Sequence, residues 1–358
     1  MQTTVPLPHK APVTIRRNEA GDDVIHISLD LNGVVVELTN IGCAITAIRT
    51  ADKHGVIKNI VAGFRDLQLY KTNKSYFGCV VGRYSNRITD GNFSENGRSY
   101  QLSRNEGSNH LHGGFSGFSH KTWELKEIIE NEESCGVCFT YFSPDGEEGY
   151  PGNLSVSVTY LLDTQNCLSI HYSAQTDKNT PVNLTNHSYF NLTGFEESTI
   201  LKHYLQVNAQ QYTIKSNVNT PTGEIASVRD TAFDFTTARE IGQYIGQLQA
   251  DKGYDHCLVL DGPAPSTLRK AAVLHEENSG RILTVYTDKP SLQVYTANHW
   301  DGSFAGEQGL VYRQHGGIAL ETQYYPDSPN HPHFPNTILQ AGETYSSTTR
   351  LEFGLLKH

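Results

Sequence analysis

Four short stretches of the chain concentrate ionisable, amide and glycine residues. They are residues 82–88 (GRYSNRI), 105–114 (NEGSNHLHGG), 183–191 (NLTNHSYFN) and 321–327 (ETQYYPD). Polar loops held by a rigid scaffold often carry function. A carboxylate accepts a proton near neutral pH and a histidine donates one there, so Glu321 together with His112 or His187 could perform acid–base chemistry.

The same residue types are compatible with other kinds of site. His110 and His112 are two positions apart, so both rings would lie on one side of a strand, and His187 with Glu321 could complete a metal shell. Asp255 and Glu321 could instead be the carboxylate pair of a glycoside hydrolase. A sugar-binding module without catalysis would use similar side chains. At this level the alternatives stay open.

The composition favours a globular chain with a neutral small-molecule partner. The 358 residues are 37% hydrophobic and 18% charged, and the formal net charge is −10. A net acidic chain repels phosphate backbones, which argues against nucleic acid. The first ten residues lack the apolar core of a signal peptide, and no run of about 18 apolar residues predicts a membrane span.

The six cysteines are too few for a disulfide scaffold in a chain of this length. We therefore expect reduced thiols and a cytoplasmic location. Cys135 and Cys138 form a CxxC pair, but no second pair accompanies it and a strand-like run follows at once. We interpret this pair as structural.

Alternating hydrophobicity predicts strands along most of the chain. Residues 25–31 alternate apolar and polar side chains, reach Asn32-Gly33 and restart at residue 34, which is the pattern of a β-hairpin. A second hairpin is expected around Asn96-Gly97. Further strands are expected at residues 154–160, 168–172, 256–260, 282–287, 292–297 and 345–353. Many short strands separated by turns predict an all-β, large antiparallel sandwich.

Very little helix is expected. The clearest case begins with a Thr-x-x-Glu capping box at Thr237, continues with apolar residues at helical spacing and ends at Gly253. We interpret the proline-rich residues 326–335 as an ordered loop. Because no linker or repeat is visible, we predict one domain over residues 1–358, with residues 1–20 as a peripheral N-terminal segment.

Taken in order, the motifs resemble those of the aldose 1-epimerase (galactose mutarotase) family. The motifs are GRYSNRI at residue 82, NHLHGG at 109, PVNLTNHSYFNL at 181, YDHCLVL at 254, LQVYTAN at 292 and ETQYYPDSPN at 321. The likeness covers nearly the whole chain, from about residue 24 to residue 353. It implies a β-supersandwich, mutarotation without a cofactor, and galactose or glucose as substrate.

The resemblance also implies roles for individual residues. His187 corresponds to the general acid and Glu321 to the general base. The positions that hold sugar hydroxyls correspond to Asn86, Arg87, His112, Asp255 and Gln293. His110 corresponds to no functional position, so no metal is expected. The chain departs from the usual motifs at Ser85, Val294 and Ala297, and these changes beside the site concern the sugar preference, not the reaction.

The resemblance leaves related activities to be weighed. A hexose-6-phosphate 1-epimerase would need a cationic pocket, and the motifs offer no cluster beyond Arg83 and Arg87. A glycosidase of this fold would be expected to carry an added helical domain. A non-catalytic sugar-binding protein would be expected to lack Glu321 or His187. We therefore expect an aldohexose as the partner, no membrane or nucleic acid, and a monomer or homodimer.

Overall fold

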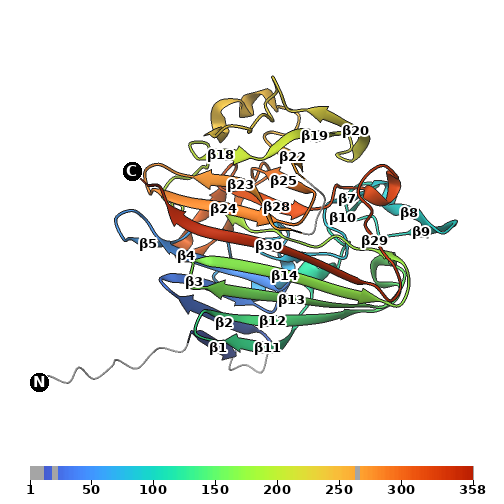
Figure 1. Cartoon of the computed structure of the whole chain (residues 1–358), viewed down its shortest axis with the longest axis horizontal. Coiled ribbons are helices and arrows are strands. Elements are labelled where there is room, and N and C mark those ends of the chain that lie inside the picture. Colours follow the sequence, from blue (N-terminus) through green and yellow to red (C-terminus); the bar gives the residue numbers. More distant parts are fainter. Residues whose placement is uncertain (1–11, 18–22, 263–266, 358) are drawn as a thin grey trace, which may run out of the picture.

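Antiparallel strands are the main regular element of the computed structural model, which describes residues 12–17, 23–262 and 267–357 (Figure 1). The largest sheet has nine strands, and β12, β13, β14 and β30 run side by side across the molecule in Figure 1. In spatial order it comprises β11 (Glu124–Glu130), β12 (Ser134–Ser143), β13 (Leu154–Asp163), β14 (Cys167–Thr176), β30 (Thr344–Leu355), β24 (Arg281–Thr287), β23 (Arg269–His275), β18 (Tyr204–Val207) and β21 (Arg239–Glu240).

Two further large sheets complete the architecture. A five-stranded sheet contains β1 (Val13–Arg17), β2 (Ile25–Leu31), β3 (Val34–Thr39), β4 (Ala44–Ala51) and β5 (Ile57–Asn59). A six-stranded sheet has the order β17 (Tyr189–Phe190), β28 (Ile318–Gln323), β25 (Ser291–Tyr295), β22 (Asp255–Leu260), β19 (Ala209–Lys215) and β20 (Pro221–Ser227). This last sheet carries several of the predicted site residues.

Short strand pairs and 3₁₀ turns fill the connections. The pairs are β6 (Val80–Val81) with β16 (Thr185–Asn186), β7 (Arg87–Ile88) with β10 (His110–Leu111), β8 (Asn92–Glu95) with β9 (Arg98–Gln101), β15 (Thr180–Pro181) with β29 (Ile338–Leu339), and β26 (Asp301–Ala305) with β27 (Val311–Arg313). The 3₁₀ turns are η1 (Leu67–Thr72), η2 (Thr89–Gly91), η3 (Phe118–His120), η4 (Glu147–Gly149), η5 (Ile241–Gln243), η6 (Ile245–Gln247), η7 (Glu307–Gly309) and η8 (Ser328–Asn330).

One apolar cluster joins the three large sheets. Ile27 from β2, Tyr160 from β13 and Leu320 from β28 all belong to it. Such alternating apolar side chains bury one face of each strand, and facing sheets then exclude water between them. The prediction of a large antiparallel β-sandwich is confirmed. No helix among the described residues is long and apolar enough to cross a membrane.

The hairpin predictions are correct. Asn32 and Gly33 both have positive φ, and they connect β2 to β3 with Leu31 opposite Val34. Asn96 and Gly97 connect β8 to β9 in the same way. Turns of this kind need positive φ at both central residues, which Asn-Gly tolerates. The strand predicted at residues 292–297 ends earlier, at Tyr295.

The helix predicted from Thr237 is wrong. The segment contains strand β21 and the two 3₁₀ turns η5 and η6. The backbone N–H of Ile241 donates to His203 and that of Gly242 donates to Leu201, so these groups bond to a neighbouring segment instead of forming helical bonds. Gly242 and Gly246 also lower the helix propensity of the segment. Tertiary pairing therefore outweighed the apolar spacing.

Three smaller predictions concern the N-terminal segment, the proline-rich loop and the CxxC pair. Val13–Arg17 form the edge strand β1, whereas residues 1–11 and 18–20 of the predicted peripheral segment lie outside the described residues. Within residues 326–335, η8 is the regular element, which agrees with an ordered loop. The Cys135–Cys138 pair lies within strand β12, with Cys135 buried, as the structural interpretation expects. The single-domain organisation stays a prediction.

Arg83 connects the polar stretch of residues 82–88 to the end of β12 and to the loop that follows it. Its guanidinium is buried and donates to the Ser143 hydroxyl at 2.9 Å, to the Ser143 and Pro144 carbonyl oxygens at 2.9 Å each, and to the Pro151 carbonyl oxygen at 3.1 Å. Buried carbonyl groups that lose their donor keep the full cost of desolvation. Arg83 is thus a structural residue, and four of its five side-chain N–H donors are already used.

Replacing Arg83 should therefore destabilise the fold. Arg83→Met keeps much of the volume but leaves several buried acceptors unpaired, and we expect a loss of about 3 kcal/mol or more in unfolding free energy. Urea denaturation measures this loss. The control is Arg98→Met, since Arg98 is exposed and rests on Tyr100. Equal midpoints for both variants would show that the Arg83 bonds contribute nothing.

Candidate active site

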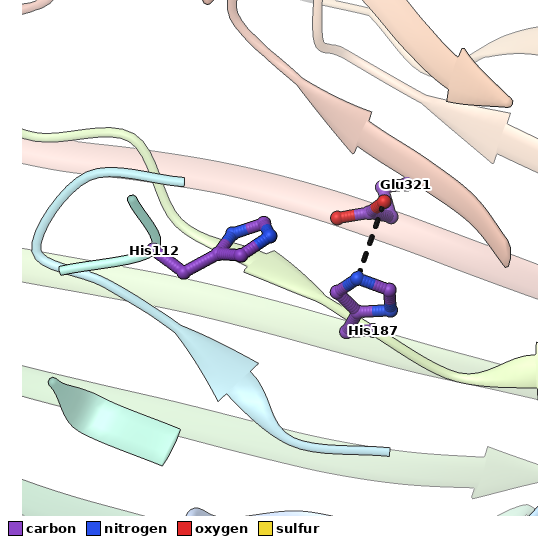
Figure 2. A group of neighbouring side chains, drawn as sticks. All are labelled: His112, His187 and Glu321. Atoms are coloured by element: carbon purple, nitrogen blue, oxygen red, sulfur yellow. Dashed lines mark ion pairs between the residues drawn. The ribbon is translucent and has the colours of Figure 1, made fainter. Parts of the chain in front are cut away.

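His187 and Glu321 meet in the interior of the molecule. His187 lies between β16 and β17, and Glu321 lies in β28, which pairs with β17 through Tyr189 and Ala319. The His187 Nε2 atom lies 3.5 Å from Glu321 Oε1, and both side chains are almost completely buried. Figure 2 shows the two facing groups, with the His112 ring beside them. The two residues predicted as acid and base are therefore adjacent.

His112 is held by the backbone of Asn86. Its ring Nδ1 accepts the backbone N–H of Asn86 at 3.2 Å, and the backbone N–H of His112 donates to the Asn86 carbonyl oxygen at 3.1 Å. Because Nδ1 is an acceptor, the neutral ring carries its proton on Nε2. The ring centroid lies 5.4 Å from that of His187. His112 thus presents a fixed N–H donor to the site.

A chain of polar contacts lies beside the pair of His187 and Glu321. It is formed by Arg87, Asp255 and Gln293. Arg87 Nη1 lies 4.0 Å from Asp255 Oδ2, and Gln293 Nε2 donates to Asp255 Oδ1 at 2.6 Å. Gln293 in β25 is directly opposite Glu321 in β28. The register of the six-stranded sheet therefore places these side chains together.

A pocket of about 350 Å³ contains most of the predicted site residues. Such a volume is at the lower end of the range for small-molecule sites. The lining includes Asn86, Arg87, His112, His187, Asp255 and Glu321. Gln293 is not among the lining residues; it borders a smaller void behind Asp255. Six of the seven predicted residues thus share one pocket, and Gln293 supports it from behind.

The pocket has further walls outside the seven residues predicted from the sequence. They are Lys74, Ser75, Tyr76, Glu106, Leu111, Tyr189, Asn219, Ala250, Asp251, Tyr295, His299 and Trp300. Tyr76 lies on two of the predicted residues, with ring-centroid distances of 4.7 Å to His112 and 5.9 Å to His187. Tyr189 belongs to the NHSYFNL motif, and Glu106 lies within the polar stretch 105–114, so both were within reach of the sequence.

Burial acts in opposite directions on the central pair. It lowers the pKa of His187 to about 4. It raises the pKa of the Glu321 carboxyl well above its usual value, and the charge of Asp255 acts in the same direction. Both shifts disfavour charge in a dry site. Asp255 is also desolvated, but the Arg87 and Lys215 charges keep the pKa of its carboxyl below the usual value.

His112, His187 and Glu321 could in principle hold a metal, because one potential ligand atom of each lies within 4.8 Å of the others. His110, the fourth ligand considered above, is not among them. Its two ring nitrogens contact the Ser103 carbonyl oxygen and the Tyr150 hydroxyl, each at 2.7 Å. The Nε2–H tautomer of His112 also leaves no lone pair toward the group. The ligand set does not favour a metal centre.

The chain resembles known proteins over almost its full length. Residues 23–352 match the sequence profile of the family described as aldose 1-epimerase. A galactose mutarotase from Homo sapiens is 41% identical, with 94% of this chain and 95% of that protein covered. An aldose 1-epimerase from Escherichia coli is 36% identical, with 90% and 92% covered.

Solved structures agree with this result. A galactose 1-epimerase from Lactobacillus acidophilus superposes with a TM-score of 0.83 at 29% identity, covering 96% of this chain and 98% of that one. An aldose epimerase homologue from C. elegans gives a TM-score of 0.82 at 28% identity, covering 91% and 97%. Profile, relatives and fold therefore agree that this chain belongs to the aldose 1-epimerase family and is an enzyme of the isomerase class.

Proposed function

We propose that the protein interconverts the α and β anomers of free, neutral aldohexoses such as galactose and glucose. The observation that carries the proposal is the buried contact of 3.5 Å between His187 and Glu321 in a small polar pocket. Anomer exchange needs one group that takes a proton and a second that gives one. A buried imidazole and a buried carboxyl within reach of one small ligand meet that requirement.

Glu321 acts as the base and His187 as the acid in the proposed mechanism. Glu321 takes the proton of the O1 hydroxyl while His187 gives a proton to the ring oxygen O5, and the C1–O5 bond breaks. The resulting aldehyde rotates about C1–C2 and presents its other face to O5. The C1–O5 bond forms again as both protons return. No electrons leave the sugar, so the reaction needs no redox cofactor.

The remaining polar residues would hold C2 to C6 while C1 rotates. His112 offers its Nε2 proton, Arg87 its guanidinium and Asp255 a carboxylate that can accept from hydroxyls. Asn86 contributes through its backbone N–H, which fixes the His112 ring. Its side-chain Oδ1 accepts the backbone N–H of Arg87 at 2.9 Å. Fixing the sugar in this way lowers the entropic part of the barrier.

A single proton shared between His187 and Glu321 is consistent with the lowered pKa of the imidazole and the raised pKa of the carboxyl. Neutral His187 with protonated Glu321 carries the same number of protons as imidazolium with carboxylate. Burial favours the neutral arrangement, and transfer of one proton over 3.5 Å gives the reactive one. The pair therefore titrates as a unit. Activity is lost when a second proton is added or when the shared one is removed.

Other activities fit the site less well. Arg83, one of the two motif arginines, is buried in bonds to backbone carbonyls and cannot bind a phosphate. Asp255, the second carboxylate of the glycosidase alternative, is engaged by Gln293 and faces Arg87. All six cysteines are free thiols, which supports a reducing compartment such as the cytoplasm. The monomer-or-homodimer expectation stays a prediction.

Variants of the pair test the proposed roles. Glu321→Gln keeps the shape but cannot accept the O1 proton, and His187→Asn cannot protonate O5. Each should lower kcat on the order of 10²–10⁴-fold, measured by polarimetry of freshly dissolved α-D-galactose and α-D-glucose. The double variant should be little worse than the weaker single variant, because the two residues act as a unit. His112→Ala serves as comparison and should also raise KM. A Glu321→Gln enzyme with a third of the wild-type kcat would place the base elsewhere.

The protonation state of His187 can be observed directly. Because its pKa is lowered to about 4, the ring should stay neutral between about pH 5 and pH 8 in the sugar-free protein. Nitrogen-15 NMR of the imidazole measures this, and the His187→Asn spectrum assigns the signal. A ring that gains its charge near pH 6.5 would mean that burial does not control the pair.

Activity should also survive removal of metals. The His112 ring donates through Nε2, so the three-residue group is better suited to hydrogen bonding than to metal binding. We expect unchanged kcat after exhaustive dialysis against EDTA. Loss of activity that zinc or manganese restores would contradict the metal-free mechanism.

A further inference from the structure

Glu106 occupies one whole edge of the Arg87 guanidinium. Arg87 Nε donates to Glu106 Oε2 and Arg87 Nη2 donates to Glu106 Oε1, each at 2.6 Å. The Arg87 side chain is 11% exposed and that of Glu106 is 36% exposed, so the carboxylate is the more exposed partner of the pair. Two parallel, charge-assisted bonds of this kind are among the stronger polar contacts in proteins.

The loop that carries Glu106 is fixed by its own hydrogen bonds. The Asn105 side chain donates to the Leu111 carbonyl oxygen at 2.9 Å and accepts the Leu111 N–H at 2.7 Å. Glu106 and Asn109 exchange two backbone bonds across a turn in which Gly107 has a φ of +57°. Glu106 therefore keeps its place without help from a bound sugar.

Cationic side chains are few around the pocket, and the less exposed of them is already paired with carboxylates. Among the described residues that line it, the lysines and arginines are Arg87 and Lys74, and Lys74 is exposed. Asp255 lies 4.0 Å from Arg87 Nη1, while Glu106 holds Nε and Nη2. A carboxylate, sulfate or phosphate prefers the forked edge of an arginine. Glu106 occupies the edge formed by Nε and Nη2, and the Nη1 side faces Asp255, so a further anion at either edge of the guanidinium would meet like charge.

We propose that Glu106 is a specificity-determining residue that closes the pocket to anions. By pairing with Arg87 it leaves the arginine able to donate to a neutral hydroxyl but unable to bind an anionic group bidentately. Uronic acids and sugar phosphates are then discriminated against, and neutral aldoses are accepted. The inference rests on the proposed function and identifies the substrate class of that same pocket.

Inhibition by sulfate tests the proposal without assuming how a sugar is oriented. Galactose mutarotation is measured against sulfate concentration, with sodium chloride keeping the ionic strength constant. Wild type is compared with Glu106→Gln, which removes the charge, and with Glu106→Ala, which also removes the side-chain acceptors. Glu343→Gln is the matched control, because Glu343 is exposed and is not among the residues that line the pocket.

Both Glu106 variants should bind sulfate more tightly. We expect the competitive inhibition constant for sulfate to fall by about tenfold or more, with no change in Glu343→Gln. The ratio of kcat/KM for galactose to that for galacturonate should fall in the same variants. An unchanged sulfate constant with a raised galactose KM would overturn the proposal and reduce Glu106 to a residue that positions Arg87.

The result can be separated from the proposed function itself. If wild type does not accelerate galactose mutarotation, the proposed function fails whatever Glu106 does. Sulfate binding to the same variants is then measured by calorimetry, which needs no activity. Sulfate binding that is equally weak in wild type and in both Glu106 variants would show that Glu106 does not prevent anions from binding to Arg87.

Discussion

The proposed chemistry depends on a carboxyl group and an imidazole that lie 3.5 Å apart and almost completely buried. His187 and Glu321 are each unfavourable as isolated charges, since burial lowers the pKa of the imidazole to about 4 and raises that of the carboxyl. As a pair they remain overall neutral with either placement of the proton. A reaction that removes a proton at one atom and delivers one at another needs this exchange. Water in the pocket would weaken it by solvating each charge separately.

The sheet architecture fixes that pair with few degrees of freedom. Glu321 cannot move along β28 without breaking its register with β25, where Gln293 lies opposite, or with β17, which follows His187. Loop residues complete the site with backbone conformations that strands do not adopt. Asn86 and His112 both have positive φ, at 63° and 51°, and they exchange backbone and ring hydrogen bonds across the loops. Non-glycine residues in this region are uncommon and often mark functional positions.

Much of this arrangement could be predicted from local patterns, and the failures have physical reasons. The Asn32-Gly33 hairpin follows from turn geometry, which is encoded within four residues. The helix at Thr237 fails because Ile241 and Gly242 bond to a distant segment. The motifs identified His187 and Glu321, whose contact the structure then shows. Glu106 lies in a loop and Arg87 in strand β7, and no spacing in the sequence reports that they pair. The motifs also identified Gln293, but its place behind Asp255, and not in the lining of the pocket, depends on the packing around β25.

Arg87 links the electrostatics of the whole pocket. Its charge lowers the pKa of Glu321 against the effect of burial, and it helps to keep the Asp255 carboxyl ionised. Asp255 in turn raises the pKa of Glu321. Glu106 pairs with the arginine at Nε and Nη2 and Asp255 lies beside Nη1, so the guanidinium that acts on Glu321 has a carboxylate at two of its sides. A change at Glu106 would therefore act on the same guanidinium that lowers the pKa of Glu321 and helps to keep Asp255 ionised.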